Sequence, residues 1–495
     1  MFESKIKGKL LSQILQFCCG LAFCMYGYDA GVLGGVQGTK PYLDALGNPT
    51  GQYIIPMIAS AYTLAAAVCA IAMMFVGLPF GRRNCVLLGD GLIIVGGIIQ
   101  STAFSVPHII VGRVIAGFGI GCVSSTVPMY LAEMSTEAKE RGPQVAVTCA
   151  LLISGVALAY WIDLGFTQLD SQVSWRFPIG FQAIFALCSA AGIFFLPDTP
   201  RWYYAMDRYS EGDAVLMRIY DLPLEHPKLQ STKIEMLASI ALENEPKNKF
   251  QWHTLIWDNS RLKAGRRIRI SFAVLSLQQL MGINMLVYYA TIIFSNVGLS
   301  DFLSSVLAAV LMTIFAAGTY FTPSTIERIG RRPIMLWTAV VCTICITIFT
   351  ILIALPNQSK ATQWTAIAFL LVYIFSLGYG WEGCAWLYGP EIAPLKYRHL
   401  GGAAGAFGQW LFTFITVFGG GIGITASGWK IWLMPVICSA FTVGFVYFMC
   451  PETKGKTLEE IDLLFTGEGA FADASEEMAK SDIEGNVVMQ EKLSL

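Results

Sequence analysis

The chain has 495 residues, of which 55% are hydrophobic and only 14% are charged, and its mean hydropathy is +0.58. Soluble domains carry about 25% charged residues, so this composition excludes an ordinary soluble protein and indicates many membrane spans. The formal net charge is -1, which gives no general attraction for nucleic acid or for acidic partners.

Apolar stretches long enough to cross a bilayer as a helix recur along the chain. They cover residues 11–36, 53–76, 85–104, 107–131, 143–163, 177–197, 269–295, 303–325, 333–355, 363–390, 401–424 and 429–450. We therefore predict an all-α membrane protein with twelve transmembrane helices in two six-helix repeats. The expected parts are a bundle over 1–197, a cytoplasmic linker of short helices over 198–268, a second bundle over 269–450 and a tail over 451–495. The end of this tail, after about residue 463, is polar and acidic and is expected to be disordered.

Lysine and arginine are distributed unevenly between the two sides of the predicted membrane protein. The loops of one side, together with both termini, hold nearly all of the 33 basic residues. The loops of the other side hold Lys40, Arg176, Lys360 and Lys430. Because basic residues concentrate in cytoplasmic loops, both termini are expected to be cytoplasmic.

Two charged motifs occur once in each half of the chain, as expected for the internal repeats of secondary transporters. A Gly-Arg-Arg triplet follows the second and eighth spans, and a Glu with a later Arg follows the fourth and tenth. The residues are Arg82, Arg83, Glu133 and Arg141, then Glu327, Arg331, Arg332, Glu391 and Arg398. Ion pairs between them would hold the cytoplasmic side shut while the cavity faces outward. The alternative is that they act only as a topology signal.

Three carboxamides lie in the middle of the seventh predicted span. Gln278, Gln279 and Asn284 interrupt an apolar run, where hydrocarbon offers no partner for their donors and acceptors. They could cross-link helices, but an amide both donates and accepts, as a sugar hydroxyl does, which favours a cavity for a hydroxyl-rich ligand. On a regular helix Gln279 and Asn284 would point about 140° apart, so we expect the helix to loosen at Gly282.

Ionisable residues also lie inside the predicted spans. Asp29 is in the first span and Arg113 in the fourth, and an ionised carboxylate there costs several kcal/mol unless it is paired. An Asp that alternates between Arg113 and a proton would provide proton coupling; a fixed structural salt bridge is the alternative. Asp90, near the cytoplasmic end of the third span, is expected to be hydrated, and Glu382 in the tenth could contact substrate or a proton.

These features together resemble the sugar porter family of the major facilitator superfamily over nearly the whole chain. The resemblance is carried by Gly27-Tyr28-Asp29, Gly112-Arg113 with Gly117, Gly119 and Gly121, residues 128–133, Arg141-Gly142, residues 197–202, residues 278–284, Gly330-Arg331-Arg332, residues 386–391 and residues 451–455. Residues 159–163 and 175–178 resemble more narrowly the fungal branch that contains hexose, pentose and glycerol carriers.

The resemblance implies further roles. Trp386 and Gln409 would join the amides in binding substrate, Trp386 by stacking on the apolar face of a sugar; a core aromatic is the alternative for Trp386. Tyr288 and Tyr289 would form the outer gate, and Glu452 would join the cytoplasmic gate. In proton-coupled members of the family, the residues matching Asp29 and Arg113 carry the coupling.

Some positions depart from the family pattern. The acid usually found three residues before the first Gly-Arg-Arg is Leu78, which predicts a weaker gate in the first half. Amides usual in the fifth and eighth spans are replaced, and so are prolines before Trp386. The replacing residues are Cys149, Val156, Phe315, Gly383 and Ala385. Fewer hydroxyl partners make a smaller polyol, a deoxy sugar or a less polar metabolite more plausible than glucose.

We expect a monomeric, multi-pass carrier of the plasma membrane that imports a monosaccharide or polyol by alternating access, coupled to protons. A facilitative uniporter, a non-transporting sugar sensor and an exporter of a secondary metabolite stay open. No enzyme, cofactor, metal or nucleic acid is expected, and Gly455-Lys456-Thr457 lacks the glycine that a phosphate-binding loop requires. The 13 cysteines lie in or beside apolar runs, which favours buried thiols over disulfides. Asn357 begins a formal glycosylation sequon in a very short loop.

Overall fold

The computed structural model describes residues 6–136, 138–244, 252–255, 257–258, 263–356, 359–393, 398–456, 461 and 464–465. Twelve helical segments in this part of the chain are long and apolar enough to cross a membrane, and the described residues contain no strand. The predicted all-α fold with twelve spans is therefore confirmed. Asn357 and nearly all of the tail after residue 463 lie outside the described residues.

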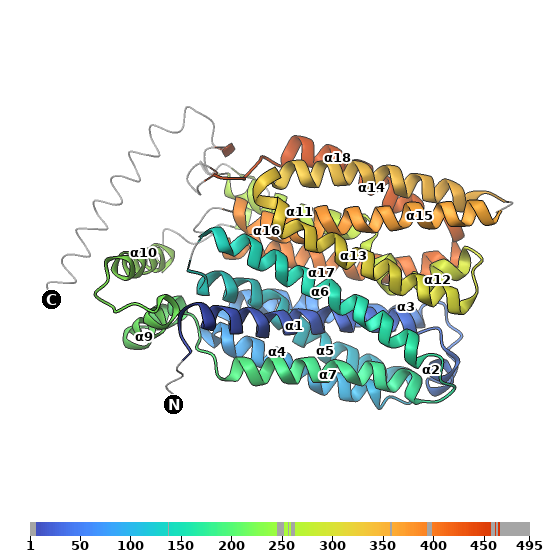
Figure 1. Cartoon of the computed structure of the whole chain (residues 1–495), viewed down its shortest axis with the longest axis horizontal. Helices are drawn as coiled ribbons and strands as arrows, with labels where there is room; N and C mark the ends of the chain where they lie inside the picture. The colour runs from blue at the N-terminus through green and yellow to red at the C-terminus, as the bar shows by residue number, and fades with distance from the viewer. Residues whose placement is uncertain are drawn as a thin grey trace.

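The first six spans are five-to-eight-turn helices that pack on one another. They are α1 (Gly8–Val36), α3 (Ile54–Phe80), α4 (Arg82–Ser101), α5 (Val106–Met134), α6 (Ala138–Phe166) and α7 (Val173–Phe194). We call this group the first bundle. The short helix α2 (Lys40–Ala45) connects α1 to α3 at the end of the bundle opposite to the start of α1 (Figure 1).

The remaining spans form the second bundle. They are α11 (Ala264–Leu280) with α12 (Ile283–Asn296), α13 (Asp301–Ile329), α14 (Arg331–Ala354), α15 (Lys360–Leu377) with the π-helical η3 (Gly378–Glu382) and α16 (Gly383–Ile392), α17 (Arg398–Ala426), and η5 (Gly428–Trp432) with α18 (Leu433–Met449). The two bundles lie side by side (Figure 1). They meet chiefly where α6 packs on α13, α3 on α17 and α1 on α12.

Two spans of the second bundle are irregular, and both irregularities lie beside the amides. The seventh span breaks between α11 and α12 at Gly282, whose φ of +99° is open to glycine but strained for other residues. A Cβ there would also lie 3.1 Å from Pro435. The predicted loosening at Gly282 is confirmed. The tenth span contains the π-helical turn η3, a geometry that is rare and is often found at functional sites.

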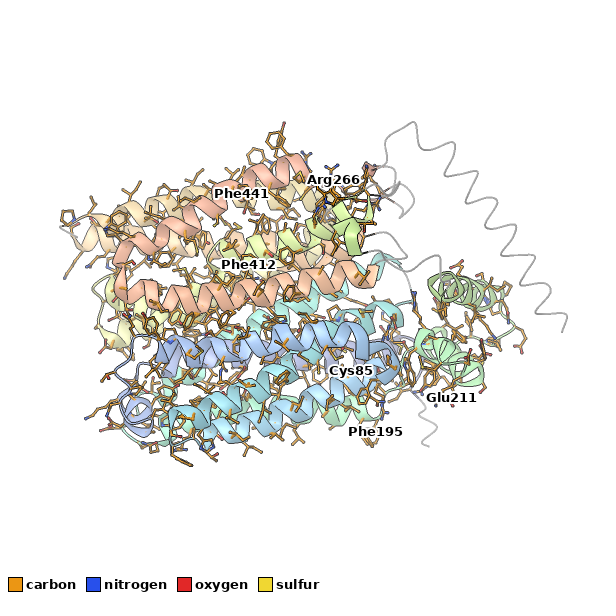
Figure 2. All side chains as sticks on the ribbon, turned by 180° about the vertical axis from the view of Figure 1, so that it is seen from behind. Cys85, Phe195, Glu211, Arg266, Phe412 and Phe441 are labelled. Atoms are coloured by element: carbon orange, nitrogen blue, oxygen red, sulfur yellow. The ribbon has the colours of Figure 1, made fainter. Side chains whose placement is uncertain are left out.

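The insert between the bundles forms the short helices predicted for it. These are α8 (Pro200–Ala205), α9 (Tyr209–Tyr220), α10 (Pro227–Asn244) and η2 (Trp252–Leu255). Helices α9 and α10 lie beyond the end of the bundles at which α1 begins (Figure 1), and Glu211 and Arg266 lie toward this same end (Figure 2). Helix α8 packs on α5, α9 on α1, and η2 on α11.

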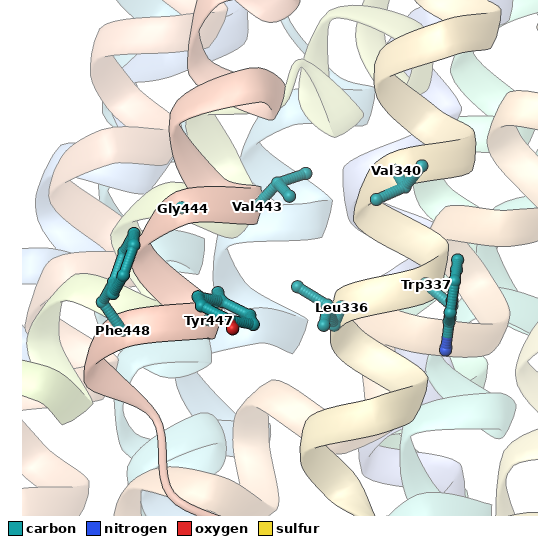
Figure 3. A pocket seen from close by; sticks show the side chains of 7 residues that line it. All are labelled: Leu336, Trp337, Val340, Val443, Gly444, Tyr447 and Phe448. Atoms are coloured by element: carbon teal, nitrogen blue, oxygen red, sulfur yellow. The ribbon is translucent and has the colours of Figure 1, made fainter.

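The outer faces of the bundles are apolar, as lipid contact requires. Phe195 and Phe441, labelled in Figure 2, are more than half exposed. A shallow groove of about 330 Å³ between α14 and α18 is lined by apolar and aromatic side chains, including Leu336, Trp337 and Phe448 (Figure 3). It contains none of the predicted substrate residues. All 13 cysteines are free, and ten of them are buried, whereas Cys188 is exposed.

Candidate functional site

The three carboxamides form one continuous hydrogen-bonded chain across the break in the seventh span. Gln279 Nε2 donates to Gln278 Oε1 at 3.1 Å, and Asn284 Nδ2 donates to Gln279 Oε1. Thr413 of α17 joins them, because its hydroxyl donates to Gln279 Oε1 at 3.3 Å and accepts from Asn284 Nδ2 at 3.2 Å. The glycine break thus brings amides together that a straight helix would separate.

Next to this chain, polar groups of α16 and α17 face the first bundle. Gln409 Nε2 lies 3.5 Å from the hydroxyl of Tyr26 on α1, and Trp410 Nε1 donates to Ser124 on α5 at 3.2 Å. The buried atoms Gln409 Oε1 and Trp386 Nε1 have no partner in the described part of the chain. Buried polar atoms without a partner are costly, so these two are available to a ligand.

The charged pair predicted in the first bundle is present and fully buried. Arg113 Nη1 lies 2.9 Å from Asp29 Oδ1, and both side chains have no exposed surface. Arg113 Nη2 also donates to the Ala59 carbonyl at 3.3 Å, and its guanidinium lies over the Tyr62 ring at 4.2 Å from the centroid. Asp29 Oδ2 has no partner among the described residues, which leaves one carboxylate oxygen available to a proton.

Tyr288 and Tyr289, the tyrosines predicted to form the outer gate, are held in different ways. The Tyr288 hydroxyl contacts the hydroxyl of Tyr62 in the first bundle, whereas the Tyr289 hydroxyl donates to the Val417 carbonyl within the second bundle at 2.9 Å. Tyr289 also has non-helical backbone angles, which marks a kink in α12. Of these two tyrosines, Tyr288 is therefore the one whose hydroxyl links the two bundles.

Backbone contacts also fasten α12 to the first bundle. Gln37 Nε2 donates to the Tyr288 carbonyl at 2.6 Å, and the Tyr160 hydroxyl donates to the Val287 carbonyl at 2.8 Å. In the opposite direction, the Thr291 hydroxyl donates to the Gly34 carbonyl at 2.8 Å. Helix α12 is thus held against α6 and the end of α1 in this structure.

The charges predicted for the cytoplasmic side of the first bundle form a compact cluster. Arg82 Nη2 lies 2.8 Å from Glu133 Oε1, and the Thr199 hydroxyl donates to Glu133 Oε2 at 2.6 Å. Asp198 accepts the backbone N–H groups of Arg82, Arg83 and Thr199 at 2.8–3.2 Å. Burial raises the pKa of Asp198, and these N–H donors oppose the rise.

The second bundle repeats this cluster with an additional acid. Arg331 lies 2.9 Å from Glu391 and 2.6 Å from Glu327. Glu452 accepts the backbone N–H groups of Arg331 and Arg332, and the Thr453 hydroxyl donates to Glu391 at 2.9 Å. Both clusters also require the glycine of the Gly-Arg-Arg triplet. A Cβ on Gly81 would collide with Asp198, and a Cβ on Gly330 would collide with Glu452.

Sequence reasoning did not identify Asp198, Thr199 and Thr453 as members of these clusters. A signal was present, because Pro197-Asp198-Thr199 and Pro451-Glu452-Thr453 repeat the same pattern after the last span of each bundle. The hydroxyls of Tyr130 and Tyr388 extend the repeat, since they donate to the Pro197 and Pro451 carbonyls.

Some predicted gate residues behave differently from the expectation. The guanidinium group of Arg83 donates to the carbonyls of Ile193 and Phe194, and that of Arg332 donates to the Tyr447 carbonyl. The described contacts of these two guanidinium groups include no acidic side chain. Their helix positions direct them away from Glu133 and Glu391. The ion pairs among the described members of these clusters each lie within one bundle. The side chains of Arg141 and Arg398 lie outside the described part.

Asp90 was expected to be hydrated, and this is wrong: it is fully buried among α4 and its neighbours.

Comparisons with known proteins agree on the family. Residues 15–465 match the family model "Sugar (and other) transporter". The chain is 30% identical over 464 residues to the MFS-type transporter oryC of Aspergillus oryzae, covering 92% of this chain and 86% of that protein. It is 29% identical over 477 residues to the Sugar transporter STL1 of Saccharomyces cerevisiae, covering 93% and 82%.

A solved structure shows the same fold. The proton:xylose symporter XylE bound to 6-bromo-6-deoxy-D-glucose superposes with a TM-score of 0.78 at 20% identity, over 92% of this chain and 99% of that one. These relatives are transporters, and the chain is accordingly not an enzyme. The family model and the relatives, together with the twelve-helix fold, identify the chain as a member of the sugar transporter family of the major facilitator superfamily.

Proposed function

We propose that the protein imports a monosaccharide or a polyol by alternating access, coupled to protons. The observation that carries the proposal is the amide chain from Gln278 to Asn284, which lies at a helix break and in which Gln278 and Gln279 are buried. Neighbouring Trp386 and Gln409 add unpartnered polar atoms. A ligand rich in hydroxyls can satisfy such donors and acceptors at once.

Asp29 and Arg113 would couple transport to protons. In this structure the pair is fully buried, and a buried ion pair stays stable only while both charges are matched. When the first bundle opens to water, Asp29 can take a proton and release Arg113. The resemblance in fold to XylE, whose name describes a proton:xylose symporter, supports this assignment.

Helix α12, the proposed outer gate, would respond to the breaking of the Asp29–Arg113 pair. Arg113 stacks on Tyr62, and the Tyr62 hydroxyl contacts Tyr288 on α12. A shift of Arg113 would therefore disturb a contact that holds the outer gate closed. On the cytoplasmic side, the Arg82 and Arg331 clusters would keep the ends of each bundle rigid while the bundles rock against each other.

Three positions at which the family resemblance leads us to expect an amide carry other residues, which favours a small or weakly polar substrate. Cys149, Val156 and Phe315 are all buried and offer at most a thiol to a ligand. The hydroxyl-binding groups consequently belong mainly to the second bundle. A polyol, a deoxy sugar or another metabolite with few hydroxyls fits this one-sided arrangement better than glucose. The plasma membrane location, cytoplasmic termini and monomeric state are proposed with it.

Uptake of labelled sugars and polyols in a host without its own transporters tests the proposal. The panel should include D-glucose, D-xylose, a deoxy sugar and glycerol, each with and without a proton uncoupler. Accumulation that the uncoupler abolishes supports proton-coupled import. Uptake that persists without accumulation would favour a uniporter, and binding without uptake would favour a sensor. The similarity to oryC is the observation that keeps a metabolite carrier as the second candidate.

A further inference from the structure

Glu382 lies directly beside the amide chain and is 4% exposed. It is the last residue of η3, and its Oε2 accepts a hydrogen bond from Gln278 Nε2 at 3.0 Å. Gln278 Nε2 also lies 3.4 Å from the Trp381 carbonyl. The π-helical turn thus places a carboxyl group at one end of the substrate amides.

The carboxylate of Glu382 determines which way the hydrogen bonds run along the row of amides. An ionised carboxylate only accepts hydrogen bonds, so Gln278 must present its NH₂ group to Glu382. The Gln278 oxygen then accepts from Gln279, and the Gln279 oxygen accepts from Asn284 and Thr413. A protonated Glu382 donates instead, which permits the amides to turn and to exchange donors for acceptors toward the ligand.

The segment also faces the other bundle. A Cβ on Gly383, the next residue, would lie 3.5 Å from Ala146 on α6 and 3.1 Å from Thr322 on α13. Among the described residues, the phenol of Tyr26 on α1 and the thiol of Cys149 on α6 are titratable groups that interact with Glu382. Both are ordinarily neutral at physiological pH, since their reference pKa values are about 10 and 8.5. The α14 side contributes the hydroxyl of Thr338 beside Gly380.

We propose that Glu382 is a positioning residue that fixes the donor and acceptor pattern of the substrate site, and that its protonation changes which hydroxylated ligands the site binds. This rests on the proposed function, because it assumes that the amide chain binds a sugar or polyol. It adds a second proton-sensitive group, separate from Asp29, that acts on affinity rather than on coupling.

The test is equilibrium binding of D-xylose, D-glucose and glycerol to the purified full chain between about pH 5.5 and 8. Measurements are made in an Asp29→Asn background, so that Asp29 contributes no titration. In this background the affinity is expected to change at least about fivefold across the range, weaker at low pH because the charge-assisted hydrogen bonds are lost. When Glu382→Gln is added to this background, the affinity is expected not to change with pH. It should be as weak at every pH as the affinity measured at low pH without this substitution.

Two controls keep the outcomes apart. Asp90→Asn removes a buried carboxyl of the first bundle and should leave the pH profile unchanged. Glu382→Gly, which removes the side chain altogether, should also give an affinity that does not change with pH, and it serves if the glutamine variant does not fold. A Glu382 variant that keeps the original pH profile overturns the inference while the proposed function stands. Failure of the unmodified chain to bind any member of the panel overturns both.

Discussion

The two bundles repeat one another at the end where α1 begins and differ in their interiors. At the ends, Arg82 with Glu133 corresponds to Arg331 with Glu391, and Asp198 corresponds to Glu452. In the interiors, the first bundle buries an ion pair and the second buries a neutral chain of amides. The repeated six-helix arrangement therefore has the same charge cluster at the end of each bundle, whereas the polar groups inside the two bundles differ in chemistry.

This difference suggests a division of tasks. A buried ion pair responds strongly to a proton, because one unpaired charge is expensive in a dry interior. Amides remain neutral and match hydroxyl groups without a charge penalty. Coupling would then belong to the first bundle and recognition to the second, with Tyr62 and Tyr288 connecting the two.

The largest expected effect is on coupling. Asp29→Asn keeps the shape of the side chain but cannot ionise, so accumulation of substrate against its gradient should be abolished while exchange is retained. Accumulation and counterflow of labelled substrate in proteoliposomes measure the two activities separately. Asp90→Asn is the matched control, since Asp90 is equally buried in the same bundle but has no arginine pair in the described residues. If Asp29→Asn still accumulates substrate, coupling lies elsewhere.

The charge clusters of the two bundles differ in the number of acids that surround the arginine. Arg331 contacts two acids and Arg82 one, so Arg331→Ala leaves more negative charge uncompensated. Breaking a fully buried ion pair lowers the free energy of unfolding by about 3–5 kcal/mol. Because Glu391 and Glu327 are partly exposed, we expect Arg331→Ala to lower it by about 2 kcal/mol. Arg82→Ala should cost less. Thermal unfolding in detergent measures both, and equal losses would remove the asymmetry.

Much of the fold and part of the site could be predicted from the sequence. Length and hydropathy determine the spans, because a helix that crosses lipid must satisfy its own backbone and expose apolar side chains. Gly282 among three amides indicated a broken helix, since no regular helix would bring Gln279 and Asn284 together. Asp29 and Arg113 could be paired because each would be too costly alone.

Other contacts depend on helix rotation and register, which local patterns do not encode. Arg82 and Arg83 are adjacent, yet one reaches Glu133 and the other reaches backbone carbonyls. The extra residue in η3 turns Glu382 toward Gln278, and no sequence signal indicated a π-helical turn. Asp90 was misjudged because depth along a span says little about which neighbours cover a side chain.

Recognition by the second bundle can be tested at Gln279. Removal of one buried hydrogen-bond partner costs about 1–3 kcal/mol, so Gln279→Ala should raise the half-saturation constant at least about tenfold. Initial uptake rates over a range of substrate concentrations provide the measurement. Gln182 of α7 is a matched control, because it is a fully buried glutamine of the first bundle. An unchanged constant for Gln279→Ala, or an equal change for Gln182→Ala, would place the ligand elsewhere.

The smallest expected effect concerns the connection between the bundles. Tyr62→Phe keeps the ring beneath Arg113 but removes the hydroxyl that contacts Tyr288. Loss of one hydrogen bond, worth about 0.5–1.5 kcal/mol, should make the outer gate easier to open. Since apparent affinity rises with the population of the open form, the half-saturation constant for external substrate should fall about two- to fivefold. Tyr42→Phe is the control, because the buried Tyr42 hydroxyl has no partner among the described residues. A constant that stays the same in Tyr62→Phe would mean that the backbone contacts of Gln37, Tyr160 and Thr291 hold the gate without help from this pair of tyrosines.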